Sequence, residues 1–161
     1  MMIAAIRKLS PTRRASKHAG RGGAAMVEAA IVLPVFLTLV LGLLDLAGAA
    51  YRYNLVSELA RRGVREAIVH GSQAPPKRVA LGPQTWTATA AAAGDVPTAI
   101  RGLLAGIDPA EVTVRLDWLD GSNAPANRVR CTVTVPYRGA TFLLSGQQMT
   151  LRATSTMAIA N

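Results

Sequence analysis

Few residues in this chain have the type and spacing that enzyme chemistry requires. The candidates for acid–base or nucleophilic roles are His18, His70 and Cys131. His18 lies in a basic N-terminal stretch, His70 follows a helical pattern, and Cys131 alternates with valines as a buried strand residue does. No Ser/His/Asp set, metal-ligand cluster or phosphate-binding loop accompanies them. We therefore predict a protein that is not an enzyme, with no catalytic residue, cofactor, metal ion or small-molecule substrate.

A group of acidic and amide residues, Asp117, Asp120 and Asn123 around Gly121, could form a calcium-binding loop. Its spacing, however, is not that of an EF-hand loop. An Asp-Gly pair between two alternating segments is typical of a hairpin connection. We therefore interpret this group as a turn.

The most informative spacing is that between Gly23 and Glu28. Gly23 ends a stretch with six lysines or arginines and no acidic residue, and Glu28 stands where a long apolar run begins. A carboxylate at the border of a bilayer is costly unless it is paired. Within its own helix, Glu28 would favour the positive end of the helix dipole.

The apolar run defines the first structural element. Residues 29–50 as a helix would be about 33 Å long, which matches the ~30 Å hydrocarbon core of a bilayer. Asp45 is the one charged residue within these positions. We predict a transmembrane helix over residues 24–50, preceded by a basic leader or cytoplasmic tail over residues 1–23.

Four residues of this helix have predicted roles of their own. Pro34 lacks a backbone donor, so we expect a bend there. Asp45 is a polar position near the outer end of the membrane, where it costs less and could face a partner rather than lipid. Gly42 and Gly48 would allow close packing against like helices.

The net charge of +9 is concentrated in the N-terminal stretch. These charges directly precede the apolar run, and no aromatic residue among them could stack on bases. We therefore interpret them as a topology signal and predict no nucleic-acid partner. The N-terminus would be cytoplasmic and residues 51–161 would form an extracytoplasmic domain.

The predicted extracytoplasmic domain combines a helix with a sheet. Residues 51–70 continue the helix with one apolar stripe. Residues 71–108 are a loop region with short helical pieces expected over 86–93 and 97–105. Residues 111–160 contain three alternating segments joined by turns, which indicate an antiparallel sheet. The expected fold is α+β, with a long N-terminal helix packed on a sheet of about three strands.

The order of basic leader, Gly23, Glu28 and apolar run resembles type IV prepilins. In that family an inner-membrane prepilin peptidase cuts after the glycine, on the cytoplasmic side. The resemblance implies cleavage between Gly23 and Ala24, which would make Glu28 the fifth residue of the mature chain. It also implies that the new N-terminal ammonium of a neighbouring subunit pairs with Glu28 and sets the register of assembly.

A longer stretch, residues 21–70, resembles the TadE-like family of bacterial tight-adherence (Flp) pilus systems. Residues 128–160 resemble the ending of that family more loosely. The residues that carry the stronger part of the resemblance are Arg21, Gly22, Ala24, Val27, Glu28, Ala30, Pro34, Gly42, Asp45, Ala60, Arg61, Gly63, Arg65 and Ala67. The resemblance implies a pseudopilin or minor pilin of the bacterial inner membrane. Its partners would be a prepilin peptidase, other pilins or pseudopilins and the pilus assembly platform.

Two alternatives remain at this stage. The small residues Ala47, Gly48 and Ala49 could direct a signal-peptide cut before Ala50, although the apolar run is longer than the 7 to 15 residues typical of such signals. The chain could also be a single-pass anchored binding module that never enters a filament. Neither alternative requires a catalytic residue.

Overall fold

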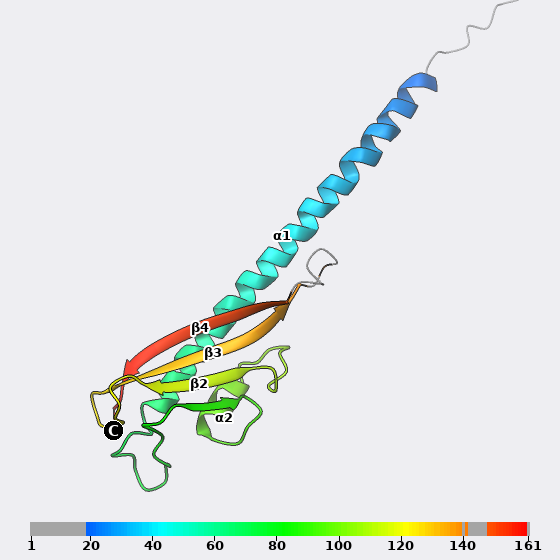
Figure 1. Ribbon diagram of the computed structural model, residues 1–161. Coiled ribbons are helices and arrows are strands. Elements are labelled where there is room, and N and C mark those ends of the chain that lie inside the picture. The colour runs from blue at the N-terminus through cyan, green and yellow to red at the C-terminus, as the bar shows by residue number, and fades with distance from the viewer. Residues whose placement is uncertain (1–18, 140, 142–147, 161) are drawn as a thin grey trace, which may run out of the picture. The chain divides into compact units, whose positions relative to one another are not determined.

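The computed structural model describes residues 19–139, 141 and 148–160, and it divides the chain into two compact units, residues 1–39 and 40–161. The predicted leader therefore lies largely outside the described residues. The helix α1, Ala19–Ala67, contributes to both units (Figure 1). Pro34 lies inside α1, and the hydroxyl of Thr38 donates a hydrogen bond to the Pro34 carbonyl at 2.8 Å.

The second unit is a four-stranded antiparallel sheet with helices on it. Its strands follow one another in the order β1-β2-β3-β4, each paired with the next along the chain. The remaining elements are β1 Trp86–Thr89, α2 Asp95–Arg101, β2 Thr113–Trp118, β3 Arg128–Arg138 and β4 Gln148–Ala158. The alternation of apolar and polar residues sends every second side chain of β2 and β3 into the core.

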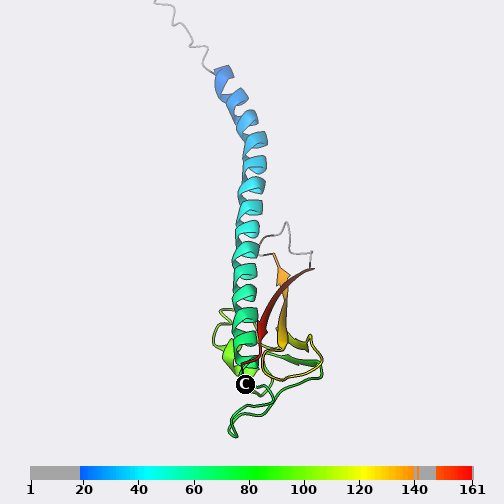
Figure 2. The ribbon, with the colours of Figure 1, turned by 90° about the vertical axis from the view of Figure 1, so that its left-hand side faces the viewer.

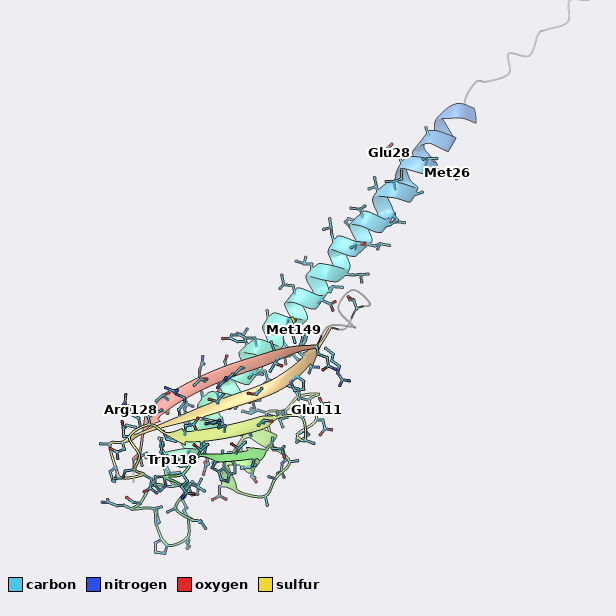
Figure 3. The ribbon with its side chains drawn as sticks, in the orientation of Figure 1. Met26, Glu28, Glu111, Trp118, Arg128 and Met149 are labelled. Atoms are coloured by element: carbon cyan, nitrogen blue, oxygen red, sulfur yellow. The ribbon has the colours of Figure 1, made fainter. Side chains whose placement is uncertain are left out.

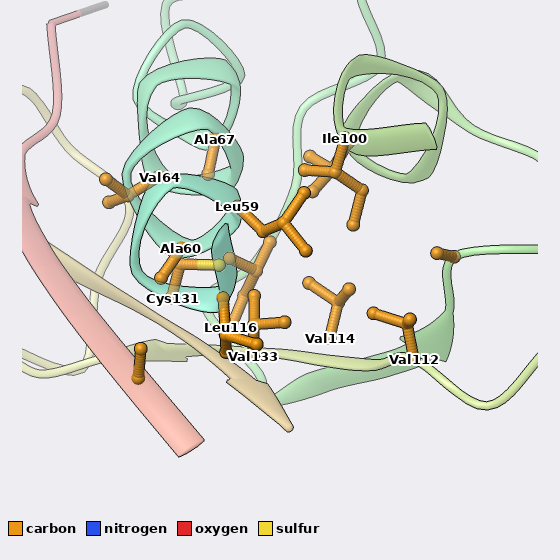
Figure 4. Packing of buried hydrophobic residues seen from close by; sticks show 14 of the residues in the cluster. Leu59, Ala60, Val64, Ala67, Ile100, Val112, Val114, Leu116, Cys131 and Val133 are labelled. Atoms are coloured by element: carbon orange, nitrogen blue, oxygen red, sulfur yellow. The ribbon is translucent and has the colours of Figure 1, made fainter. Parts of the chain in front are cut away.

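The core forms where the C-terminal part of α1 packs against this sheet (Figure 2). Close to the packing contact, side chains from α1, α2, β2 and β3 interdigitate (Figure 4). The helix contributes an apolar stripe of fully buried residues: Val56, Leu59, Ala60, Val64 and Ala67. Gly63 belongs to the same face, because a Cβ built on it would lie only 2.7 Å from the sulfur of Cys131.

The predicted fold is confirmed: a long N-terminal helix packs on an antiparallel sheet. The sheet has four strands rather than about three. The helix expected over residues 86–93 is wrong, because Trp86–Thr89 form β1 and pair with β2. Helix propensity is a weak preference, and tertiary context such as pairing with β2 overrides it here.

Two other expectations are adjusted by small amounts. The second helical piece, expected over residues 97–105, is the shorter α2, which ends before Gly102. The amphipathic helix expected to reach residue 70 ends at Ala67. The turn expected around Gly121 does connect β2 to β3.

Candidate functional site

The N-terminal part of α1 exposes a continuous apolar surface. All side chains of residues 23–40 are exposed, and Figure 3 shows Met26 and Glu28 pointing away from the helix. Among the described residues, α1 is the one helix long and apolar enough to cross a membrane. The large exposed apolar side chains before residue 47 are Met26, Val27, Ile31, Val32, Leu33, Val35, Phe36, Leu37, Leu39, Val40, Leu43, Leu44 and Leu46. Exposed apolar surface on this scale marks an interaction with other proteins or with lipid.

The predicted cleavage and register residues lie on this exposed segment. A Cβ built on Gly23 would meet nothing within 4 Å, so no packing within the described chain explains a glycine there. Glu28 is exposed and forms no ion pair with any described residue. The roles of Gly23, Ala24 and Glu28 thus depend on partners outside the chain and remain predictions.

Asp45 marks the point at which α1 first becomes buried. Its side chain is 1% exposed. The backbone N–H of Thr141 donates to Asp45 Oδ1 at 3.0 Å, and the Thr141 hydroxyl donates to Oδ2. In addition, the hydroxyl of Tyr137, on β3, donates to the backbone carbonyl of Asp45 at 3.1 Å. The carboxylate thus has a partner in its own chain just beyond β3, and the backbone carbonyl of Asp45 has one on β3.

The two glycines expected to pack against other helices differ in their surroundings. A Cβ at Gly48 would lie 3.1 Å from the hydroxyl oxygen of Tyr137, so Gly48 makes room for the chain's own sheet. A Cβ at Gly42 would meet nothing within 4 Å. The space beside Gly42 is open among the described residues, so its packing against another helix stays a prediction, whereas Gly48 has a close neighbour in its own chain.

His70 lies just after the end of α1 and is 2% exposed. Its Nδ1 is 2.8 Å from the carbonyl oxygen of Val79, which can only accept, so Nδ1 is the donor of this hydrogen bond. Its Nε2 has no hydrogen-bond partner among the described residues and lies 3.3 Å from Asp95 Oδ2 and 3.5 Å from Glu66 Oε1. Glu66 is also paired with Arg78 at 3.1 Å. These contacts connect the end of α1 to α2 and to the following loop.

Neither His70 nor Cys131 belongs to a recognisable catalytic or metal centre. Within the described ranges, no group of three or more His, Cys, Asp or Glu residues is arranged to hold a metal ion. Cys131 is fully buried, and burial raises the pKa of its thiol to about 12. The reactive thiolate is therefore scarce at neutral pH, and Cys131 is a core residue, as its alternation with valines predicted.

Sequence reasoning missed one group of charged residues near the junction of α1 and the sheet. Arg52, Asp108, Glu111 and Arg138 line a surface hollow of about 210 Å³. They come from α1, from the segment before β2 and from the end of β3, so their proximity depends on the tertiary fold. No local spacing in the sequence could have indicated it.

These features define a class of protein: a single helix of membrane-spanning length whose second half carries a small α+β domain. Within that class, the profile of the TadE-like protein family matches residues 23–65. The match confirms the resemblance found in the sequence. It extends from the predicted cleavage glycine through the exposed apolar surface into the buried stripe of α1. Comparisons with curated proteins and with solved structures find no match.

Proposed function

We propose that this chain is a non-enzymatic minor pilin or pseudopilin that acts in the assembly of a tight-adherence pilus. The observation that carries the proposal is the coincidence of two features on α1. The family match covers residues 23–65, and the same segment holds the continuous exposed apolar surface. In a structural subunit of this kind, the apolar surface would first contact the lipid of the membrane and later contact other subunits.

The proposed topology has one membrane span. The basic leader would stay in the cytoplasm, and the sheet domain would lie outside the bacterial inner membrane. Residues 24–44 would cross the bilayer, since 21 helical residues span about 32 Å. This is shorter than the span expected from the sequence, because the buried contacts of Asp45 favour an end of the span at that residue.

Processing and assembly would depend on the start of this span. A prepilin peptidase would cut between Gly23 and Ala24. The new ammonium group of one subunit would then pair with Glu28 of its neighbour, because an unpaired carboxylate is costly at the bilayer border. Other pilins or pseudopilins and the assembly platform would be the further partners, with Gly42 available for close helix packing.

The first test is the N-terminal sequence of the full chain extracted from membranes. A chain that starts at Ala24 is expected. A chain that starts at Met1 would contradict processing and favour an anchored binding module, and a chain that starts at Ala50 would favour a cleaved signal peptide.

A second test separates insertion from assembly. Glu28→Gln should leave membrane insertion intact and strongly reduce the number of assembled pili. Glu58→Gln is the matched control, since Glu58 carries the same charge on the second unit, and its one ion pair with a described residue, Arg61, is exposed. Equal pilus counts in the two variants would contradict the proposed role of Glu28.

A further inference from the structure

The hollow between α1, the end of β3 and the segment before β2 is lined by two basic and two acidic residues. Asp108 Oδ1 accepts a hydrogen bond from the backbone N–H of Ala110 at 2.9 Å. Arg52 and Arg138 provide the positive charges, and Asp108 and Glu111 provide the negative charges. None of the four forms an ion pair with a described residue, although other arginines of the sheet, such as Arg115, do. The hollow thus presents separated charges of both signs to a space of about 210 Å³.

The position of Arg52 is fixed by its neighbours. Its guanidinium carbon lies 5.9 Å from the centre of the Tyr137 ring, and the hydroxyl of Tyr137 bonds the carbonyl of Asp45. Side chains on a helix lean toward its N-terminus, which here is the direction of Asp45. Arg138 follows Tyr137 directly on β3. The guanidinium of Arg52 is therefore held near the residues that connect the sheet to Asp45, and Arg138 lines the same hollow from the end of β3.

The other side of the hollow lies at the same end of the sheet. Figure 3 shows Glu111 near the end of the sheet where β3 finishes, whereas Arg128 lies at the opposite end. Thr141, just beyond β3, is the residue that bonds the Asp45 carboxylate. The four charged residues thus gather at the end of the domain that contacts Asp45.

This end of the domain would face the lipid headgroups, an argument that rests on the proposed membrane span. If the span ends at Asp45, the headgroup layer follows over roughly 5 to 7 Å. Arg52 begins about 10 Å of helix rise beyond Asp45 and leans back toward it. Tyr51 and Tyr53, which flank Arg52, are both exposed, as aromatic residues at membrane interfaces are.

We propose that this hollow binds the headgroup of a zwitterionic phospholipid with a primary ammonium, namely phosphatidylethanolamine. Arg52 and Arg138 would bind the phosphate, because guanidinium groups form paired hydrogen bonds to phosphate oxygens. Asp108 and Glu111 would accept hydrogen bonds from the ammonium. A choline headgroup has no N–H to donate, and a glycerol headgroup brings no positive charge to the carboxylates.

The test is native mass spectrometry of the full chain in detergent, with phosphatidylethanolamine, phosphatidylcholine and phosphatidylglycerol of identical acyl chains at equal concentration. The ethanolamine lipid should be retained about tenfold more than either of the others, the size expected for loss of a charge-assisted hydrogen bond. Equal retention of the three lipids, or a preference for phosphatidylglycerol, would overturn the proposal.

Variants of the lining residues test whether the preference for the ethanolamine lipid arises in the hollow. Arg52→Gln should lower retention of the ethanolamine lipid about tenfold, and Glu111→Gln should remove the preference for ethanolamine over choline. Arg130→Gln is the matched control, because Arg130 is an exposed arginine of β3 that does not line the hollow. An effect of Arg130→Gln equal to that of Arg52→Gln would show general charge attraction and overturn the site.

A measurement of membrane insertion distinguishes failure of this proposal from failure of the proposed function. The full chain is reconstituted into vesicles, and resistance to alkaline extraction reports insertion. A chain that inserts and shows no lipid preference overturns the headgroup site and leaves the pilin proposal standing. A chain that does not insert overturns both.

Discussion

The two parts of α1 contain similar apolar residues but use them in opposite ways. From residue 23 to residue 40 every side chain is exposed, and the apolar residues surround the helix. From Val56 to Ala67 the apolar residues form one stripe that is buried against the sheet, with Arg61, Arg62 and Arg65 exposed. A helix that is apolar on all sides needs a non-aqueous environment or partners around it, whereas a stripe needs a single surface. The comparison thus separates the part of α1 that holds the domain together from the part available to membrane and partners.

The largest expected effect comes from truncating a buried leucine of the stripe. Leu59 is fully buried, so Leu59→Ala should lower the free energy of unfolding of the sheet domain by about 2 to 5 kcal/mol. Leu39 is 69% exposed, and Leu39→Ala should change it by less than about 0.5 kcal/mol. Urea unfolding of the full chain in detergent, followed by near-UV circular dichroism, measures both. Similar losses of unfolding free energy in the two variants would contradict the division of α1 into a buried part and an exposed part.

The next effect tests the border between the two parts. Asp45→Asn replaces the carboxylate that accepts hydrogen bonds from Thr141 with a neutral amide. It should lower the free energy of unfolding by about 1 to 3 kcal/mol in the same measurement. Thr141→Val removes only the hydroxyl and should cost less. Thr150→Val is the control, because Thr150 is an exposed threonine of β4. A loss of stability in Asp45→Asn no larger than that in this control would contradict the view that the contacts of Asp45 hold α1 on the sheet.

A pair of glycines provides a smaller and more specific test. In Gly63→Ala the new methyl group would clash with the Cys131 sulfur. The clash should outweigh the gain in helix propensity and leave a net loss of about 1 kcal/mol. Adding Cys131→Ala should recover part of that loss, because it removes the clashing sulfur. Gly42→Ala should not destabilise the domain, and a loss there comparable to that of Gly63→Ala would contradict the comparison.

The smallest effect concerns a charge pair of the sheet that does not involve α1. Arg128 donates side-chain and backbone hydrogen bonds to Asp120, and these hold the pKa of the Asp120 carboxyl below its usual value. A carboxyl whose pKa is lower in the folded state stabilises that state above its unfolded pKa of about 4, and this stabilisation is lost as the pH falls through the folded pKa.

Asp120→Asn should accordingly lower the urea midpoint at pH 7, and the difference from the unmodified chain should shrink on acidification. Asp117→Asn provides a comparison at a neighbouring carboxylate that is paired with Arg115 instead. A difference for Asp120→Asn that stays constant from pH 7 to strongly acidic conditions would contradict the linkage.

Much of the fold followed from local patterns in the sequence. The period of two in β2, β3 and β4 and the stripe after Asn54 were sufficient to predict an α+β domain. β1 was missed because its four residues lie in an alanine-rich stretch, and only pairing with β2 makes them a strand. The partner of Asp45 could not be predicted, because Thr141 lies 96 residues away. Spacing singled out Gly23 and Glu28, and their predicted roles stay predictions because they would depend on molecules outside the chain.

The direct passage of α1 into the core has a mechanical consequence. Asp45 and the buried stripe from Val56 to Ala67 lie on one continuous helix, so no flexible linker separates them. A force along the axis of this helix would act as a shear force on the contacts of Leu59, Val64 and their neighbours, all at the same time. Contacts loaded in this way share the force and must give way together. When the helix is pulled out of a membrane, the sheet would therefore move with it and stay packed on it.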